Sequence, residues 1–430
     1  MLNNQDHFSL NLNVRGLKES ATLAINEKSK ELLYRGKSVY RLGLGQSPFP
    51  VPAVIQEALR QNAHQKDYLP VQGLRTLREA VSKYHAKYDG IHFNPDSVLI
   101  GPGSKELMFL LQLSYYGDLV IPTPCWVSYS PQAKIVGRPV VTLATTFENE
   151  WRLQPESLHR LCEQDPGRPR LVILNYPGNP EGGTYKKETL QEIAEIARKY
   201  DLILLSDEIY GKLNYSGEHI SIARYYPEGT IVSSGLSKWC GAGGWRLGTF
   251  TFPESLKWLQ TAMASVASET YTSTSAPIQY AAVRAFEGGL AIENYLVHSR
   301  RILARLGGWA TGRVRETGAR VVSPEGAFYL FPDFTPISDK FTKQNIHTSA
   351  ELCSRLLDET GVAILPGVDF GRPEQELTVR IAYVDFDGAQ ALTASEQIPL
   401  TEEIGYEFIE TYCYNTKKGV DILCDWVNAL

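Results

Sequence analysis

Short, continuous apolar runs separated by longer amphipathic stretches form the main pattern in the middle of the chain. Runs of this length are typical of strands that are buried on both faces of a sheet. The intervening stretches, centred on 187–199 and 254–267, have helical character. Alternation of strands and helices indicates βαβ units and a largely parallel sheet, hence an α/β fold. The predicted strands cover residues 98–100, 139–144, 171–175, 202–206 and 230–234.

The pattern changes near residue 290, where a long helical stretch begins. Apolar residues recur near helical spacing from Ile292 to Thr317, with arginines on the other face. Later segments favour a smaller α+β domain, with strands at 321–331, 362–367 and 377–383 and a helix over 409–430. Three parts are therefore expected: an N-terminal arm over 1–49 with a helix near 23–33, a large domain over 50–290, and a C-terminal small domain over 291–430 that includes the arm.

Polar side chains follow three of the predicted strands, at the ends where those strands stop. In open α/β sheets, ligands bind beyond the carboxyl ends of the strands. These side chains are therefore expected to converge on one ligand. They are Asn179, Asp207, Tyr210, Lys238 and Arg246.

Lys238 lies in a loop of small residues between a predicted strand and Arg246. Desolvation and a nearby cation favour a neutral amine, which can condense with an aldehyde. A solvated loop lysine is the alternative, but Asn179 and Asp207 upstream favour the first interpretation. Pyridoxal phosphate needs a Schiff-base lysine, a carboxylate against the pyridinium nitrogen, donors to its phenolic oxygen and a cradle for its phosphate.

A candidate phosphate cradle precedes this set. The segment 98–111 indicates a strand, a glycine turn with Gly103 and Ser104, and an apolar helix. Free backbone N–H groups and the positive dipole end of a helix suit a phosphate. Alone the turn would be unremarkable, but the downstream lysine loop favours the phosphate interpretation.

Composition narrows the class of protein further. The 430 residues include 43% hydrophobic and 21% charged residues, as in ordinary soluble enzymes. A net charge of −5 and the lack of a dense Lys/Arg run argue against nucleic-acid binding. No apolar run approaches the length needed to span a membrane, and the first residues resemble neither a signal nor a transit peptide, so we expect a cytoplasmic protein.

The cysteines and histidines show no ligand pattern. Six cysteines are scattered without CxxC pairs, which suits reduced thiols in the cytoplasm. Eight histidines lack metal-ligand spacing, so no metal is expected.

The ordered motifs resemble those of the class I/II aminotransferases of fold type I, most closely the bacterial aspartate aminotransferase branch. The motifs are Asn-Pro at 179–180, Ser-Asp-Glu-Ile-Tyr at 206–210, Leu-Ser-Lys at 236–238 and Gly-Trp-Arg-Leu-Gly at 244–248. The resemblance runs from about residue 19 to residue 383. It implies a homodimer with shared sites and the cofactor pyridoxal 5'-phosphate.

The resemblance also assigns further residues to the site. Tyr68 would reach the cofactor phosphate of a neighbouring subunit, and the ring of Trp126 would stack on the pyridine. Gly45 and Arg380 would bind the substrate α-carboxylate, the arginine through its planar fork. Lys105, beside the phosphate cradle, would meet the distal carboxylate of a dicarboxylic substrate; the alternative is a helix-start lysine that points to water.

Two departures from the family pattern bear on this site. Glu181-Gly-Gly replaces the usual Thr-Gly after Asn179-Pro, which leaves the loop shape and substrate choice open. Gly235 stands where several relatives have a phosphate-binding serine, so Ser237 becomes the hydroxyl candidate, with Ser234 a poorer one.

The expected activity is transfer of an amino group between an L-amino acid, with aspartate and glutamate favoured, and a 2-oxo acid. Lys238 would act as general base and acid, with Asp207 and Tyr210 tuning the cofactor. A lyase or cyclase of the same fold is the alternative, because these residues would serve its carbanion equally well. A regulator with an aminotransferase-like domain would need a DNA-binding module, for which the arm leaves no room.

Overall fold

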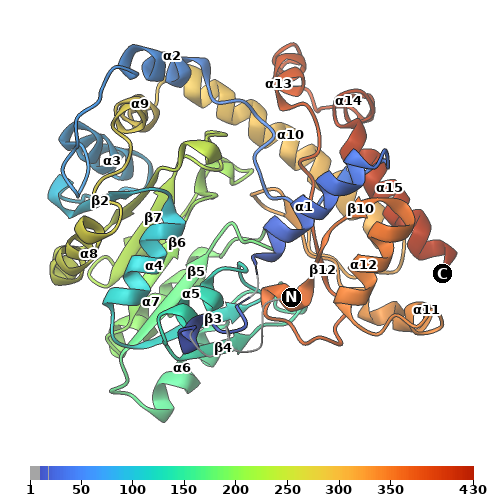
Figure 1. Cartoon of the computed structure of the whole chain (residues 1–430), viewed down its shortest axis with the longest axis horizontal. Helices are drawn as coiled ribbons and strands as arrows, with labels where there is room; N and C mark the ends of the chain where they lie inside the picture. Colours follow the sequence, from blue (N-terminus) through green and yellow to red (C-terminus); the bar gives the residue numbers. More distant parts are fainter. Residues whose placement is uncertain (1–9, 18) are drawn as a thin grey trace.

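A seven-stranded sheet runs through the computed structural model of the chain, which describes residues 10–17 and 19–430 (Figure 1). Neighbouring strands are parallel except β8, which is antiparallel to β2 and to β7. The predicted α/β class with a mostly parallel central sheet is confirmed. In spatial order the strands are β2 (Val98–Gly101), β8 (Gly248–Thr251), β7 (Thr230–Gly235), β6 (Ile203–Asp207), β5 (Arg170–Asn175), β3 (Asp118–Thr123) and β4 (Val140–Ala144).

Helices cover both faces of this sheet because its strands are apolar on both sides. In β5, Leu171 and Ile173 pack with α4, α5 and α8, whereas Val172 and Leu174 pack with α6 and α7. Full burial of such a side chain stabilises the fold by roughly 1.5–3 kcal/mol. The bounds are α4 (Ser104–Ser114), α5 (Tyr129–Ile135), α6 (Pro155–Gln164), α7 (Lys187–Lys199) and α8 (Lys257–Glu269).

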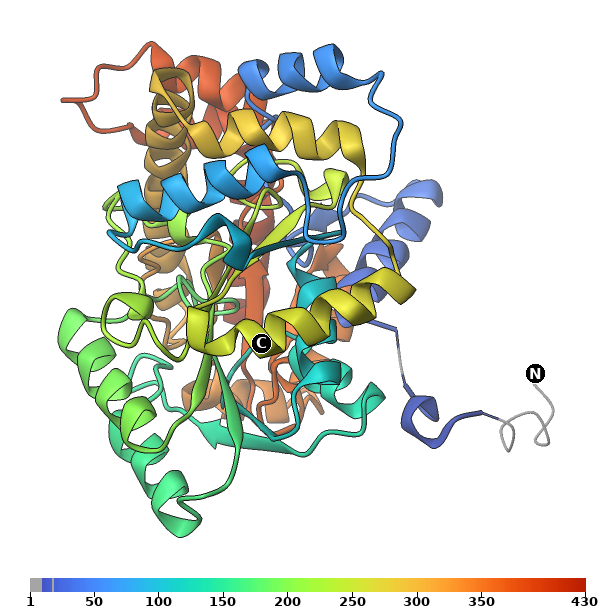
Figure 2. The ribbon, with the colours of Figure 1, turned by 90° about the vertical axis from the view of Figure 1, so that its left-hand side faces the viewer.

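Three more helices form a layer near the β2 edge of the sheet. Figure 2 shows α9 (Ala276–Glu287) between α2 (Ala53–Asn62) and α3 (Arg75–Tyr88), and α9 contacts both of them. The same view shows a short helical turn, Leu12–Val14, at the edge of the molecule. There the Asn13 side chain donates to the Ile135 carbonyl, 3.2 Å away.

The second group of elements is built around the long helix α10 (Leu290–Arg315). A three-stranded antiparallel sheet has the order β11 (Leu365–Pro366), β12 (Val379–Ala382), β9 (Tyr329–Leu330), and β1 (Tyr40–Arg41) pairs in parallel with β10 (Val362–Ala363). The other helices are α1 (Ala21–Tyr34), α11 (Ser338–Thr342), α12 (Ser349–Thr360), α13 (Gly388–Glu396), α14 (Tyr406–Tyr412) and α15 (Tyr414–Ala429).

Three predicted elements are wrong in extent. The strand expected over 321–331 is reduced to β9, since Ala327 just before it has a left-handed φ of 55°. The strand expected over 362–367 divides into β10 and β11, which pair with different partners. The helix expected over 409–430 is interrupted at Cys413, whose ψ of 28° ends α14 before α15 begins.

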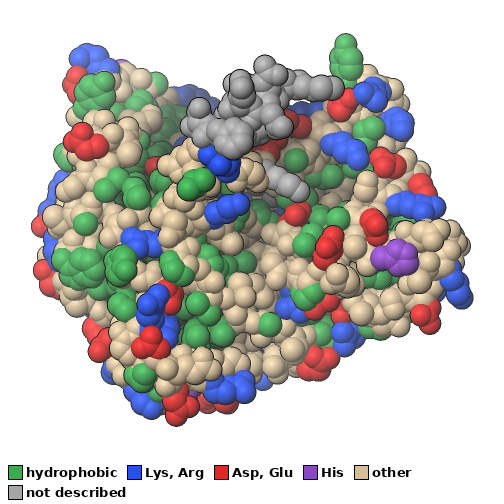
Figure 3. Space-filling model, turned by 60° about the horizontal axis from the view of Figure 1, so that its bottom comes forward, with side chains coloured by type: hydrophobic (Ala, Val, Ile, Leu, Met, Phe, Trp, Pro, Cys, Tyr) green, Lys and Arg blue, Asp and Glu red, His purple; other side chains and the backbone are tan. Residues whose placement is uncertain are grey.

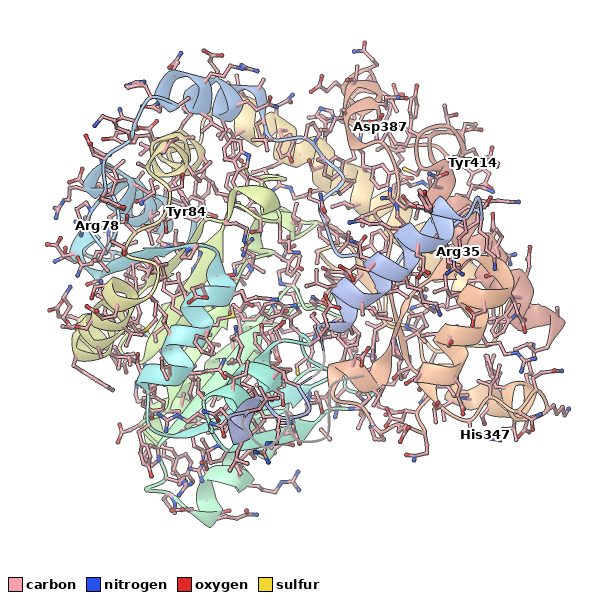
Figure 4. The ribbon with its side chains drawn as sticks, viewed as in Figure 1. Arg35, Arg78, Tyr84, His347, Asp387 and Tyr414 are labelled. Carbon is pink, nitrogen blue, oxygen red and sulfur yellow. The ribbon has the colours of Figure 1, made fainter. Side chains whose placement is uncertain are left out.

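The two groups of elements lie side by side. Figure 4 places the labelled α3 residues with the large sheet, and the other labelled residues on the opposite side with α12, α13 and α15. The division at residues 49 and 290 stays a prediction, and part of the expected arm, residues 1–9 and 18, lies outside the described residues.

The surface shows no segregation of charge on the face drawn in Figure 3, where acidic and basic side chains are interspersed. Within the described part of the chain, no helix has the length and apolar character needed to cross a membrane.

Candidate active site

A cavity of about 360 Å³ opens beyond the carboxyl ends of β5, β6 and β7. This is the edge at which the sequence predicts a ligand site. Parallel strands explain the convergence, since their carboxyl ends meet at one edge of the sheet. The predicted residues that line the cavity are Gly45, Ser104, Lys105, Trp126, Asn179, Asp207, Tyr210, Ser237, Lys238, Arg246 and Arg380.

Lys238 lines this cavity with a buried side-chain amine. Its Nζ donates to the Gly45 carbonyl at 2.6 Å and lies 5.5 Å from the centre of the Tyr210 ring. Burial, reinforced by the guanidinium of Arg380, lowers the pKa of Lys238 to about 7. Near neutral pH much of this amine is therefore unprotonated and nucleophilic.

Asp207 ends β6, is buried, and lines the cavity. The Tyr129 hydroxyl donates to its Oδ2 at 2.6 Å, and Ser233 Oγ lies 3.4 Å from its Oδ1. Burial raises the pKa of Asp207 to about 6, although the Tyr129 hydrogen bond acts in the opposite direction. The carboxyl is thus held in one orientation and is ionised near pH 7.

Tyr329 is a cavity residue that the sequence analysis does not single out. Its hydroxyl is 2.7 Å from that of Tyr210, and its ring centre is 4.7 Å from the guanidinium carbon of Arg380. A Cβ at Gly45 would lie 2.1 Å from the same hydroxyl, so only glycine fits there. The segment Gly326-Ala-Phe-Tyr is the only local signal, and it indicates a strand rather than a site.

Other lining residues absent from the predicted set include Ser128, Asn175, Gly243 and Gly244, with Ser20 and Leu23 near the start of α1.

Arg380 is buried, with 1% of its surface exposed, beside Asn179. Its Nη1 donates to Asn179 Oδ1 at 3.1 Å, and its Nη2 donates to the Gly43 carbonyl. Its Nε is buried and has no hydrogen-bond partner among the residues that the structure describes. A buried guanidinium with a free donor is suited to a carboxylate ligand.

The start of α4 forms the other end of the cavity. Gly103 precedes the helix with a φ of 94°, and a Cβ there would lie 2.2 Å from Arg246 Nη2. A Cβ at Gly248 would lie 2.2 Å from the Ser104 nitrogen, so both glycines are needed for this close packing. Free helix N–H groups beside Arg246 and Ser237 make an electropositive cradle suited to a phosphate.

Lys105 and Trp126 lie together on the wall of the cavity. The Lys105 Nζ is 5.1 Å from the centre of the Trp126 ring. Partial burial of the ammonium, together with the Arg246 charge, lowers the pKa of Lys105. The residue as a whole remains exposed to solvent, so a ligand can reach its ammonium group.

Two predicted residues do not line the cavity. Gly103 lies behind Arg246, as described above. Tyr68 is 89% exposed and lies outside the cavity of its own chain. Its predicted role needs a second subunit.

Comparison with known proteins places this geometry in a family. The sequence model for "Aminotransferase class I and II" matches residues 37–393. An aspartate aminotransferase of Bacillus sp. (strain YM-2) is 34% identical over 380 residues, which cover 86% of this chain and 93% of that relative. The aspartate/prephenate aminotransferase of Thermus thermophilus is 33% identical over 367 residues, which cover 84% of this chain and 91% of that relative. The solved structure of the Thermus thermophilus aspartate aminotransferase with maleate has a TM-score of 0.81 at 31% identity and covers 90% of this chain and 97% of that one.

Proposed function

Because this chain belongs to the class I and II aminotransferases, and is therefore a pyridoxal-phosphate-dependent transaminase, we propose that its preferred amino-acid substrates are aspartate and glutamate. The single observation that carries the proposal is Lys105. Its ammonium lines the same cavity as Arg380 and has no carboxylate within 4.0 Å among the described residues. Two separate cations suit a ligand with two carboxylates. The relatives are named as transaminases, so the lyase or cyclase alternative is not favoured.

The residues present fit the cofactor. Lys238 offers an amine with a lowered pKa, Asp207 a buried carboxylate, and Tyr210 and Asn179 polar groups that line the same cavity. In the proposed arrangement Asp207 would hold the pyridine nitrogen, and Gly103, Ser104, Ser237 and Arg246 would hold the phosphate. Trp126 would cover the ring. When bound, pyridoxal phosphate supplies an electron-accepting ring that stabilises a carbanion at the substrate Cα.

The chain's own residues then supply binding and proton transfer. Arg380 and the Gly45 backbone would orient the α-carboxylate. The amine of Lys238 would hold the cofactor, and it would also take the proton from the substrate Cα and return it at the cofactor C4′. Its lowered pKa leaves the amine free to act as a base near neutral pH. Asp207 would keep the ring nitrogen protonated, since a buried carboxylate favours a cationic partner.

Removal of the Lys105 charge tests the substrate proposal. In Lys105→Ala, kcat/KM for aspartate and glutamate is expected to fall roughly 5- to 150-fold, the equivalent of ~1–3 kcal/mol for a charged hydrogen bond. Alanine and phenylalanine should react at nearly unchanged rates, since they carry no second carboxylate. Lys105→Arg retains the charge and serves as the control. Equal slowing of all four substrates would assign Lys105 to structure or to the phosphate and would contradict the proposal.

We also propose a homodimer with shared active sites. Tyr68 is almost fully exposed and lies outside the cavity of its own chain. An exposed phenol hydroxyl at this position supports a contact with the phosphate end of the site in a second copy. Obligate interfaces commonly bury more than ~2,000 Å² in total. Sedimentation of the holoenzyme should therefore show a dimer, and Tyr68→Phe should weaken cofactor retention. A fully active monomer would contradict this prediction.

A cytoplasmic location is proposed on the cysteine chemistry. All six cysteines are free, and five of them are buried. Buried thiols of this kind suit a reducing compartment. Fractionation of the source cells with a specific antibody would test the location.

A further inference from the structure

The turn that carries Asn179 encloses a buried carboxyl group. After β5 the chain folds back on itself: the Gly178 nitrogen donates to the Gly183 carbonyl at 2.8 Å, and the Gly182 nitrogen donates to the Gly178 carbonyl at 2.9 Å. Glu181, at the centre of this turn, is 8% exposed. A Cβ at Gly178 would lie 1.6 Å from Glu181 Oε1, so the carboxyl lies directly against the backbone of residue 178.

The surroundings of this carboxyl are mostly apolar. Glu181 lines a narrow pocket next to two residues of the active site, Asn175 and Asn179. The rest of the lining is mainly apolar or aromatic and includes Cys125, Tyr129, Trp151, Tyr185 and two prolines. No Lys, Arg or His nitrogen of the described chain forms an ion pair with Glu181. Arg152 is the cation that acts on this carboxyl from beyond ion-pair distance; its two terminal nitrogens pair with Glu150 and Glu325, and its buried Nε has no hydrogen-bond partner among the described residues.

The titratable groups that face this carboxyl are few. Arg152 favours its ionised form. Burial is the main cause that raises the pKa of Tyr185 and of Cys125, and the negative charge of an ionised Glu181 raises both pKa values further. The hydroxyl of Tyr129 is committed to Asp207. An ionised Glu181 would therefore be compensated by its own backbone N–H and by Arg152, which lies near the same turn but forms no ion pair with it.

The same turn connects several parts of the active site. The Asn179 nitrogen donates to Asn175 Oδ1 at 2.8 Å, and Asn179 Oδ1 accepts from Arg380. On its outer side, the Gly182 carbonyl accepts from the nitrogens of Glu325 and Gly326, just before β9. A change in the shape of the turn would thus move the partner of the guanidinium proposed to bind the substrate.

We infer that Glu181 acts as a neutral carboxylic acid that holds the 178–183 turn closed, and that its ionisation opens the turn, displaces Asn179 and weakens substrate binding by Arg380. Glu181 is thereby a positioning residue. The effect on substrate binding rests on the proposed function. The neutral state of the buried Glu181 carboxyl does not depend on that function.

The electrostatics agree with the geometry. Burial raises the pKa of Glu181 from 4.5 to about 8, against smaller opposing effects of its own backbone N–H and of Arg152. A pKa that is raised on folding means that the native protein holds a proton that the unfolded chain has lost. The stabilisation is complete below pH ~4.5 and is lost as the pH rises through about 8.

The first test is the stability of the holoenzyme against denaturant at fixed protein concentration, from pH 5 to pH 9. The folding equilibrium constant of the wild type, divided by that of Glu181→Gln, should fall by up to ~10-fold per pH unit to about pH 8 and then level off. Glu188→Gln, a change at an exposed position on α7, should give a flat ratio. Glu181→Thr, which restores the usual family residue, replaces the glutamine variant if that variant fails to fold. A flat ratio for both Glu181 variants means an ordinary ionised carboxylate and overturns the inference.

The second test is the pH profile of KM for aspartate. In the wild type KM should rise above pH 8 on the order of 10-fold, as expected for a displaced contact, and Glu181→Gln should lack this rise. Identical profiles in both proteins would overturn the positioning role. If no amino acid is transaminated at all, the proposed function fails, and the stability ratio still decides whether Glu181 is a buried neutral acid.

Discussion

Transamination is expected to fall by more than ~10⁴-fold in Lys238→Ala, because the substitution removes the amine that we propose both to hold the cofactor and to move the proton. The amine of Lys238 lines the cavity and has a pKa lowered to about 7. The other lysine of the described cavity lining, Lys105, lies against the Trp126 ring and is not expected to take over this role. Turnover of aspartate with 2-oxoglutarate, followed together with the visible absorbance of the bound cofactor, measures both losses.

The loss should not arise from unfolding. Among the described residues the ammonium of Lys238 makes one hydrogen bond, to the Gly45 carbonyl, and its burial is itself unfavourable for the charged form. Circular dichroism of Lys238→Ala should match that of the wild type. Lys187→Ala, at an exposed position on α7, is the matched control and should retain full activity. Turnover near the wild-type level in Lys238→Ala would contradict the entire site assignment.

Asp207→Asn is expected to lower kcat on the order of 10²-fold or more while some cofactor remains bound. Asparagine has nearly the same shape and can still accept from Tyr129, so the geometry of the β6 end should persist. The neutral amide would no longer favour a protonated ring nitrogen, the role that we propose for the Asp207 carboxylate. Rates of the half-reaction with aspartate, measured by absorbance, isolate this step from product release.

The matched control for this change is Asp165→Asn, at an exposed position after α6. It should leave the half-reaction unchanged. A Tyr129→Phe variant should give an intermediate loss, since it removes one donor to Asp207 but keeps the charge. An unchanged rate in Asp207→Asn would place that carboxylate outside the reaction.

Much of the site is encoded in short sequence segments, for a geometric reason. Each parallel strand ends at the same edge of the sheet, so a polar residue just after an apolar run is brought to that edge whatever the loops do. Asn179 and Lys238 follow β5 and β7 in this way, Asp207 is the last residue of β6, and all three line one cavity. The apolar runs that form these strands are visible without any tertiary information.

Contacts between distant segments, by contrast, were decided only by the tertiary structure. Tyr329 meets Tyr210 across 119 residues, and Arg380 meets Asn179 across 201 residues. The two-residue strands of the second group carry too little periodicity to place such residues, and the left-handed Ala327 breaks the pattern before β9.

The sequence by itself determined the α/β class, the family and the series of polar residues at the strand ends, because these depend on local apolar runs and on motifs of a few residues. Only the tertiary structure decided which groups become buried. Glu181 reads as a polar turn residue, yet packing against Gly178 and Cys125 encloses it and raises its pKa to about 8. Burial depends on which segments cover a residue, and those segments come from distant parts of the chain.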